Sequence, residues 1–312
     1  MSPIKSVFLD TDIGDDIDDA LALAMLLNSP EVDLLGISTV HGEVETRSRI
    51  AAAMLEEWNR RQIPVCNGFG QPYNKNPRTG FVQYQGRILR GRLEFESIIR
   101  QPLIRFMSQR IKSAGRPVIL LGIGPLTNIA RLIQADPAIS GCLSEIVLMG
   151  AGINRIEWNF EMDPEAADIV MRAGLPVRLI PVNITEKSVM DRDVLHALRD
   201  SEHSAHNMLY ELVCHWQEIH NSDLPILHDP LAVGAILRPD LFQFQPMAIN
   251  VNLDPAVNAR GYSSAKSDPR SSIQACVLCD YEGFSGLYRN ITLAPPRTDA
   301  ALRAPRKKPV AT

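Results

Sequence analysis

The 312-residue chain has little of several features that would assign it to a specialised class of protein. It has no uninterrupted apolar stretch near the length of about 20 residues that a membrane-spanning helix needs. The N-terminal stretch MSPIKSVFLD lacks the apolar core and small-residue cleavage site of a signal peptide, so we expect a cytoplasmic protein. The net charge of −4 gives no general attraction to anionic surfaces, so neither nucleic acid nor membrane is an expected partner.

Cysteine is also sparse, with five residues scattered over the chain. An odd number without a signal peptide argues against a disulfide framework. Cys276 and Cys279 form a C-x-x-C pair, which sometimes binds metal or carries out redox chemistry. No second pair accompanies it, and the surrounding IQACVLCDY is an apolar, strand-like stretch. We therefore expect two buried thiols here.

Short apolar runs alternate along the chain with longer stretches of helical period. The predicted strands are residues 6–10, 32–40, 117–124, 145–150, 177–183 and 247–253. The predicted helices are residues 18–28, 45–60, 97–113, 126–135, 164–173 and 203–220. Such alternation predicts an α/β fold: a single domain with a mostly parallel, Rossmann-like open sheet and helices on both faces. In such sheets ligands bind beyond the carboxyl ends of the strands.

The domain boundaries follow from composition. Residues 1–294 contain no linker or repeat and are predicted to form the single domain. Residues 295–312 are rich in proline and basic residues with few apolar anchors, which predicts a disordered basic tail. Residues 68–92 form a long stretch rich in Gly, Asn, Arg and Pro, and a loop of this length usually has a function.

The feature that most needs an explanation is the stretch VFLDTDIGDDIDDALALAMLLNSP, residues 7–30. It carries six aspartates at positions 10, 12, 15, 16, 18 and 19. Asp10 and Asp12 end the first predicted strand, and Asp18 and Asp19 open a predicted helix, where acidic side chains can cap free amides. Capping explains one or two of the six. Several converging carboxylates are stable when a hard divalent cation such as calcium or magnesium neutralises them.

Two known uses of such aspartates fit poorly. An EF-hand loop starting at Asp10 would need glutamate at its twelfth position, where this chain has Leu21. The strand-end D-x-D also resembles haloacid dehalogenase-like phosphotransferases, whose first aspartate is the nucleophile. That family has a small or hydroxyl residue soon after the second aspartate, whereas this chain continues as IGDDIDD, residues 13–19. The phosphotransferase remains the less favoured alternative.

The stretch resembles more closely the signature D-x-D-x-G-x-D-D-A of the inosine–uridine-preferring nucleoside hydrolases. This chain has DTDIGDDIDDA, two residues longer between Gly14 and Asp18. Four further segments match that family in order, and the resemblance spans about residues 5–290. They are GISTVHGE (36–43), GIGPLTNIA (122–130), EWNFEMDPEAA (157–167) and LHDPLA (227–232).

The resemblance implies calcium-dependent hydrolysis of the N-glycosidic bond of ribonucleosides to free base and ribose. The reaction would pass through an oxocarbenium-like transition state with a metal-activated water. The implied calcium ligands are the side chains of Asp12, Asp19 and Asp229 and the backbone carbonyl of Ile123. Asp12 would also be the general base, and Gly122 and Gly124 would allow the tight turning that carbonyl ligation at Ile123 needs.

The remaining roles implied by the resemblance concern the sugar and the base. Asp18 would hydrogen-bond a ribose hydroxyl or the water, and Glu157 and Asn159 would bind sugar hydroxyls. His228, beside an implied metal ligand, would give a proton to the departing base. Asp163 is the predicted N-cap of the following helix, with Pro164 at its first position.

The longer aspartate stretch leaves part of the assignment open. Asp15 or Asp16 could take the role given to Asp12, although Asp12 is favoured because it lies nearest the strand end. Asp10 is expected to bond backbone or neighbouring groups rather than the ion.

Two further positions depart from the family pattern. Glu43 stands where many members have asparagine, which would add a carboxylate near the metal, and Gln85 stands where histidine is common. A non-catalytic or altered-specificity ribose- or nucleoside-binding relative is therefore an alternative. The resemblance further implies a nucleoside substrate, a role in nucleoside salvage, and a homodimer or homotetramer.

Overall fold

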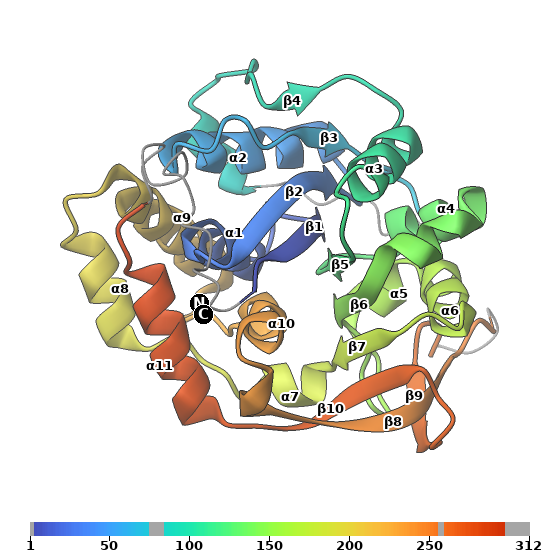
Figure 1. The fold of residues 1–312 in the computed structure, drawn as a ribbon. Helices are drawn as coiled ribbons and strands as arrows, with labels where there is room; N and C mark the ends of the chain where they lie inside the picture. The colour runs from blue at the N-terminus through green and yellow to red at the C-terminus, as the bar shows by residue number, and fades with distance from the viewer. Residues whose placement is uncertain (1–2, 75–83, 255–258, 297–312) are drawn as a thin grey trace, which may run out of the picture.

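The computed structural model describes residues 3–74, 84–254 and 259–296. Within these ranges ten strands form one twisted sheet in the order β4-β3-β2-β1-β5-β6-β7-β10-β8-β9 (Figure 1). The strands are β1 (Lys5–Thr11), β2 (Val32–Thr39), β3 (Val65–Asn67), β4 (Ile98–Ile99), β5 (Val118–Gly122), β6 (Leu143–Met149), β7 (Val177–Ile180), β8 (Phe242–Val251), β9 (Ser263–Ser267) and β10 (Ile273–Cys279). Pairing is parallel from β4 through to β10, and β8 and β9 add two antiparallel pairings at one edge. The predicted α/β fold with a mostly parallel sheet is confirmed.

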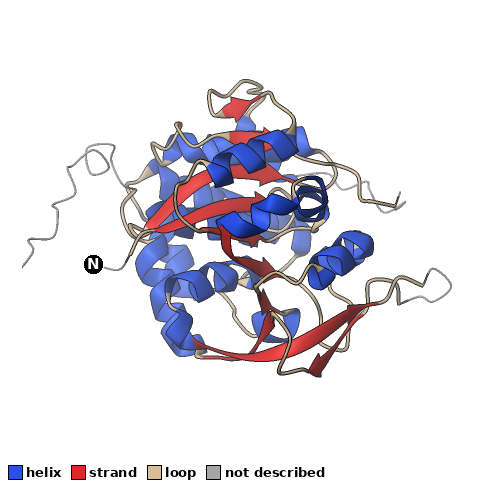
Figure 2. Cartoon of the chain, turned by 45° about the vertical axis from the view of Figure 1, so that its right-hand side comes forward, coloured by secondary structure: helices blue, strands red, loops and turns tan. Residues whose placement is uncertain are grey.

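Helices cover both faces of the sheet (Figure 2). They are α1 (Asp18–Asn28), α2 (Val44–Glu57), α3 (Leu103–Lys112), α4 (Thr127–Ala135), α5 (Trp158–Met162), α6 (Pro164–Arg172), α7 (Val182–Thr185), α8 (Arg192–Arg199), α9 (Ser204–His220), α10 (His228–Leu237) and α11 (Tyr281–Thr292), with 3-10 turns η1 (Tyr84–Leu89), η2 (Pro137–Cys142) and η3 (Pro239–Leu241). In β1, Val7 and Leu9 belong to one buried cluster with α1, α2 and α10, whereas Phe8 belongs to a second cluster with α3, α4 and α6. This alternation shows that β1 is covered on both faces, as its continuous apolar sequence requires.

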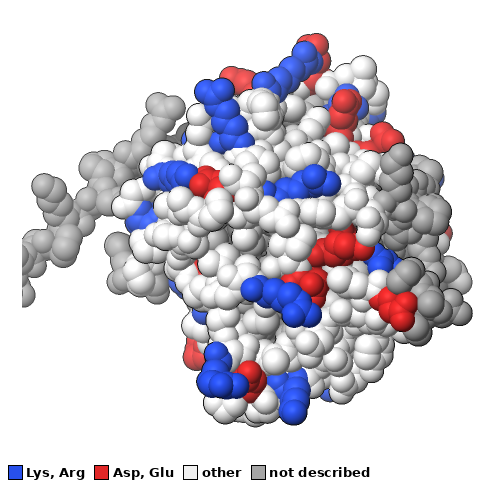
Figure 3. All heavy atoms as spheres, turned by 90° about the vertical axis from the view of Figure 1, so that its right-hand side faces the viewer, with Lys and Arg blue, Asp and Glu red and all other residues white. Residues whose placement is uncertain are grey.

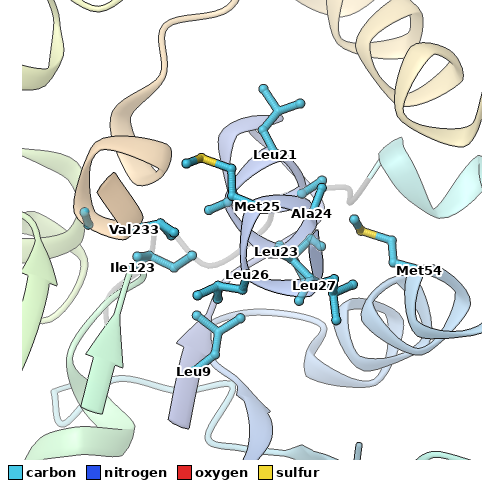
Figure 4. Close-up of a cluster of buried hydrophobic side chains, with 14 of the residues drawn as sticks. Leu9, Leu21, Leu23, Ala24, Met25, Leu26, Leu27, Met54, Ile123 and Val233 are labelled. Carbon is cyan, nitrogen blue, oxygen red and sulfur yellow. The ribbon is translucent and has the colours of Figure 1, made fainter. Parts of the chain in front are cut away.

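Helix α1 lies at the centre of the larger cluster. All eleven of its residues are buried, which agrees with a sequence that is apolar around the whole helix. Figure 4 shows its side chains meeting Leu9 of β1, Met54 of α2, Val233 of α10 and Ile123. The N-terminus of α1, with two aspartates, is therefore held rigidly next to the end of β1.

Several boundaries differ from the prediction. The helix predicted over 97–113 begins only at Leu103, because Ile98–Ile99 pairs with β3 and Pro102 precedes the first helical turn. The strand predicted over 177–183 ends at Ile180, after which Pro181 leads into α7. The short strands β3, β4 and β9 and helices α5, α7, α8, α10 and α11 were not among the predicted elements, whereas β10 confirms the strand-like character expected around Cys276 and Cys279.

Cys276 and Cys279 lie on β10, and a bulge between Cys276 and Leu278 interrupts its pairing with β8. Both thiols are buried and free, and burial raises the pKa of Cys276 to about 11 and that of Cys279 to about 12. Thiols of this kind are unreactive, so the expectation of two buried thiols is confirmed.

Parts of two predicted segments lie outside the described residues. These parts are residues 297–312 of the predicted tail and residues 75–83 of the loop 68–92. None of the helices that the structure describes combines the length and apolar character needed to cross a membrane. On the face formed by α3, α4 and α6, acidic and basic side chains are interspersed (Figure 3), with ion pairs such as Lys112–Asp136 at 2.5 Å and Arg172–Asp168 at 2.7 Å.

Candidate active site

The carboxyl ends of the central parallel strands meet at one edge of the sheet. Asp10, next to the last residue of β1, pairs with Ser38 of β2 and with Gly122, the last residue of β5. A cavity of about 550 Å³ opens beyond these ends, where α1 and α10 begin. Every residue that the sequence analysis assigned to the site lines this cavity: Asp12, Asp18, Asp19, Ile123, Glu157, Asn159, His228 and Asp229.

Three buried carboxylates converge in the cavity. Oxygens of Asp18, Asp19 and Asp229 all lie within 4.8 Å of one another. Asp18 and Asp19 occupy the first turn of α1, and Asp229 that of α10, whose backbone amide at Asp229 donates to Asp18 Oδ2 at 3.3 Å. Burial, followed by repulsion among the neighbouring aspartates, raises the pKa of all three well above the ordinary value. Such a cluster suits an oxygen-preferring divalent cation, whose charge would remove the repulsion.

Asp12 lines the same cavity but does not belong to this group of three. Burial raises the pKa of Asp12 to about 7, and the nearby Arg47 guanidinium acts in the opposite direction. Its carboxylate packs against the backbone at Gly124, where an added Cβ would lie only 2.6 Å from Asp12 Oδ1. Gly124 therefore has no side chain because the Asp12 carboxylate lies close to its backbone. Neither Gly122 nor Gly124 has a positive φ, so neither glycine is required there by a left-handed backbone conformation.

The other three aspartates of this stretch, Asp10, Asp15 and Asp16, lie in or next to the aspartate loop, which we define as residues 12–17, and each has different surroundings. Asp10 is buried below the loop and accepts hydrogen bonds from Ser38 Oγ at 2.5 Å and Asn128 Nδ2 at 2.7 Å, as expected for a residue bonding neighbouring groups. Asp15 also lines the cavity, and its Oδ2 pairs with Arg47 at 2.7 Å. Asp16 is exposed and lies on the cavity wall.

Glu157 and Asn159 enter the cavity through the turn that starts α5. Glu157 caps this helix by accepting from the backbone amides of Asn159 at 2.8 Å and Phe160 at 3.2 Å. Burial raises the pKa of Glu157 to about 7. Asn159 Nδ2 donates to the carbonyls of Ile123 and Met149, each at 3.2 Å, so it ties the ends of β5 and β6 together. Asp163 caps α6 as predicted, with Pro164 at its first position.

His228 is held by a residue that sequence reasoning missed. Its Nδ1 lies 2.6 Å from Thr185 Oγ1, at the end of α7. Burial lowers the pKa of His228, so the imidazole is neutral at pH 7, although nearby Asp16 and Glu186 act in the opposite direction. Thr185 Oγ1 also lies 3.4 Å from the carbonyl of Val182. Where its hydroxyl donates to Nδ1 instead, the neutral imidazole carries its proton on Nε2 and can donate from there.

The cavity also has an apolar and aromatic part. Trp158 and Ile219 are unusually exposed for their size, at 40% and 50%, and both line the cavity together with Tyr84 and His220. Tyr84 Oη and His220 Nε2 lie 3.3 Å apart. None of these four residues was assigned a role from the sequence; they come from η1, α5 and α9.

Two predicted departures have different outcomes. Glu43 is exposed at the start of α2 and is not among the residues lining the cavity, so no added carboxylate is found there. Gln85 is fully buried and bonds the aspartate loop, where its Nε2 donates to the carbonyls of Asp15 at 3.2 Å and Asp16 at 2.5 Å.

The mostly parallel sheet and the acidic pocket beyond its strand ends are features of an α/β enzyme with a divalent-cation site. Comparison with known protein families identifies which one. The profile of the inosine-uridine preferring nucleoside hydrolases matches residues 7–286. The chain therefore belongs to that family and is a nucleoside ribohydrolase, a hydrolase acting on N-glycosyl bonds. Membership does not support the phosphotransferase interpretation of the D-x-D sequence.

Individual relatives agree with this assignment. The non-specific ribonucleoside hydrolase RihC of Escherichia coli (strain SMS-3-5 / SECEC) is 33% identical over 257 residues, covering 78% of this chain and 83% of the relative. Among solved structures, the plant nucleoside hydrolase PpNRh1 superposes with a TM-score of 0.81 at 25% identity, covering 94% of this chain and all of the other. The purine-preferring ribonucleoside hydrolase from Gardnerella vaginalis gives a TM-score of 0.80 at 26% identity, covering 93% and 98%.

Proposed function

We propose that this enzyme hydrolyses the N-glycosidic bond of ribonucleosides with the help of one calcium ion bound by the acidic cluster. The observation that carries the proposal is the convergence of Asp18, Asp19 and Asp229 within 4.8 Å in a cavity that also presents Asp12, Glu157 and His228. The relatives named above as ribonucleoside hydrolases support the substrate class.

The donor set fits a calcium ion. Asp12, Asp19 and Asp229 would hold it with the carbonyl of Ile123, and Asp18 stands close enough to join them or to bind a ribose hydroxyl. All of these ligand atoms are oxygens, and at least three belong to carboxylates. Such ligands favour a hard cation such as calcium over softer metal ions. When bound, the ion would supply positive charge that lowers the pKa of a coordinated water.

The side chains then divide the chemistry between sugar and base. Asp12, whose pKa is about 7 without metal, would accept the proton of the attacking water. Glu157 and Asn159, held by backbone contacts at the start of α5, would orient the sugar and oppose the positive charge that develops on it.

His228 would assist the departing base. As a neutral imidazole anchored by Thr185, it would donate a hydrogen bond from Nε2–H to a nitrogen of the base, stabilising the charge that accumulates there. The wall formed by Trp158 and Ile219 gives the planar base an apolar surface.

The direct test is an incubation of the full chain with a panel of purine and pyrimidine ribonucleosides and calcium, with free ribose and free base measured. Release of both with at least one nucleoside, lost on chelation and restored by calcium, supports the proposal. Calcium and nucleoside binding without any turnover would instead identify the non-catalytic relative considered above.

Thr185→Val tests the role of His228. Valine keeps the shape of threonine but removes the hydroxyl that fixes the imidazole, so kcat should fall about tenfold while KM changes little. Steady-state kinetics on the best nucleoside measure both values. Thr292→Val, at a buried threonine of α11, is the matched control and should leave kcat unchanged. Equal kcat in both variants would remove Thr185 from the mechanism.

The assembly into a homodimer or homotetramer and the role in nucleoside salvage rest on the family resemblance and stay predictions. The cytoplasmic location rests on the N-terminal sequence and also stays a prediction. The boundary of the domain at residue 294 also stays a prediction.

A further inference from the structure

Arg47 of α2 is buried completely beneath the aspartate loop. Its Nε donates to the carbonyl of His41 at 2.7 Å, and one terminal nitrogen donates to the carbonyls of Asp12 and, at 3.1 Å, Ile13. The other terminal nitrogen pairs with Asp15 Oδ2 at 2.7 Å. A buried guanidinium is costly unless its donors are satisfied, and here the planar fork meets four acceptors at once.

Gln85, on the turn η1, continues this set of contacts along the loop. Its backbone amide donates to the carbonyl of Gly14 at 3.2 Å, and its side chain donates to those of Asp15 and Asp16. Each backbone carbonyl from residue 12 to residue 16 therefore accepts a hydrogen bond from Arg47 or Gln85. The two residues come from separate elements, and both are 0% exposed.

Neither residue reaches the substrate space. Arg47 and Gln85 are absent from the cavity lining, whereas Asp12 and Asp16, whose carbonyls they hold, belong to it. Arg47 also places a positive charge near Asp12 and Asp19, where it opposes the effect of burial on both carboxylates. Any action of these residues on the reaction must therefore pass through the loop.

We infer that Arg47, together with Gln85, is a positioning residue that fixes the aspartate loop and so keeps the Asp12 carboxylate in the calcium and substrate cavity. The sequence DTDIGDDIDDA is two residues longer than the family signature that it resembles, so the loop has additional backbone carbonyls that need hydrogen-bond donors. Arg47 and Gln85 supply the donors for this loop. The inference rests on the proposed function and adds the residues that shape its site.

The test compares Arg47→Met and Arg47→Lys with wild type. Methionine removes all the donors, and lysine keeps the charge but cannot reproduce the planar fork. We expect both to weaken calcium binding, measured by titration calorimetry, and to lower kcat, each by about 10- to 100-fold. KM should change by less, because Arg47 touches no substrate. Amide hydrogen exchange of residues 12–19 in the chelated protein should become faster.

Two further variants keep the test decisive. Arg49→Met alters the next arginine of α2, which pairs with Glu45 at the surface, and should change none of these measurements. Gln85→Met removes the side-chain donor at nearly constant volume and should reproduce the exchange and calcium effects in weaker form, even if Arg47→Met does not fold.

The inference is overturned if a folded Arg47→Met or Gln85→Met variant keeps wild-type calcium affinity, kcat and loop exchange. A wild-type enzyme that neither binds calcium nor cleaves any ribonucleoside would defeat the proposed function instead. The exchange measurement on the metal-free protein would then still report whether Arg47 fixes the loop.

Discussion

Replacing Asp229 by asparagine should lower kcat for the best nucleoside by at least about a thousandfold. Asp229 belongs to the group of carboxylates that converge within 4.8 Å, and it lies beside His228 at the start of α10. The amide keeps the size of the side chain but removes one negative charge from the cation site. Steady-state release of ribose and calorimetric titration with calcium measure the two expected losses together.

The same variant should melt at a higher temperature than wild type in the presence of chelator. Burial, followed by repulsion from Asp18 and Asp19, raises the pKa of Asp229. At neutral pH the metal-free native state must therefore hold a proton there that the unfolded state releases, and asparagine avoids that cost. A gain in stability combined with a loss of activity excludes misfolding as the cause. Asp240→Asn, at an exposed aspartate that pairs with Arg238, is the matched control and should change neither property. Wild-type turnover in the Asp229 variant would refute the assigned site.

The fold was predictable where local pattern and burial agree. Helix α1 was predicted with both ends correct because it begins with two aspartates after a glycine-containing turn and is apolar throughout. Strand β3 was missed because three residues carry no periodic signal. Helix α10 is buried on every side, so its sequence HDPLAVGAIL shows no amphipathic period.

The site was predictable to the level of its strand ends and motifs. Carboxylates after β1 and at the start of α1 must meet at one edge of a parallel sheet, which brought Asp12, Asp18 and Asp19 together. The sequence could not show that Asp18 lies in the closest group and Asp12 beside it, because the longer loop changes the path of the chain. Nor could it show that Arg47, rather than Arg49, is the buried arginine, since two positions in the same helical turn differ only in the direction they face.

The metal-free enzyme should lose stability as the pH rises from about 4 to 8. The pKa of Asp12 is raised to about 7, and burial and mutual repulsion raise those of Asp19 and Asp229 still more clearly. At a pH between a group's pKa in the unfolded state and its higher pKa in the folded state, the native protein holds a proton that the unfolded chain has released. Each such group therefore stabilises the protein at low pH, and this contribution is lost as the pH rises through the folded-state pKa. The expected loss is on the order of a few kcal/mol.

Calcium should remove most of this dependence at neutral pH. Binding requires the carboxylates to be ionised, so affinity rises with pH and proton release accompanies binding near pH 6. At a thousandfold excess over its Kd the ion adds about 4 kcal/mol to the free energy of unfolding. Thermal melts with chelator and with calcium, at several pH values, measure both slopes. Asp10 and Glu157 have pKa values near 7 and are not assigned as ligands, so the calcium-loaded protein should keep a weaker downward slope. Parallel melting curves with and without calcium, at every pH, would mean that the buried acids do not form the cation site.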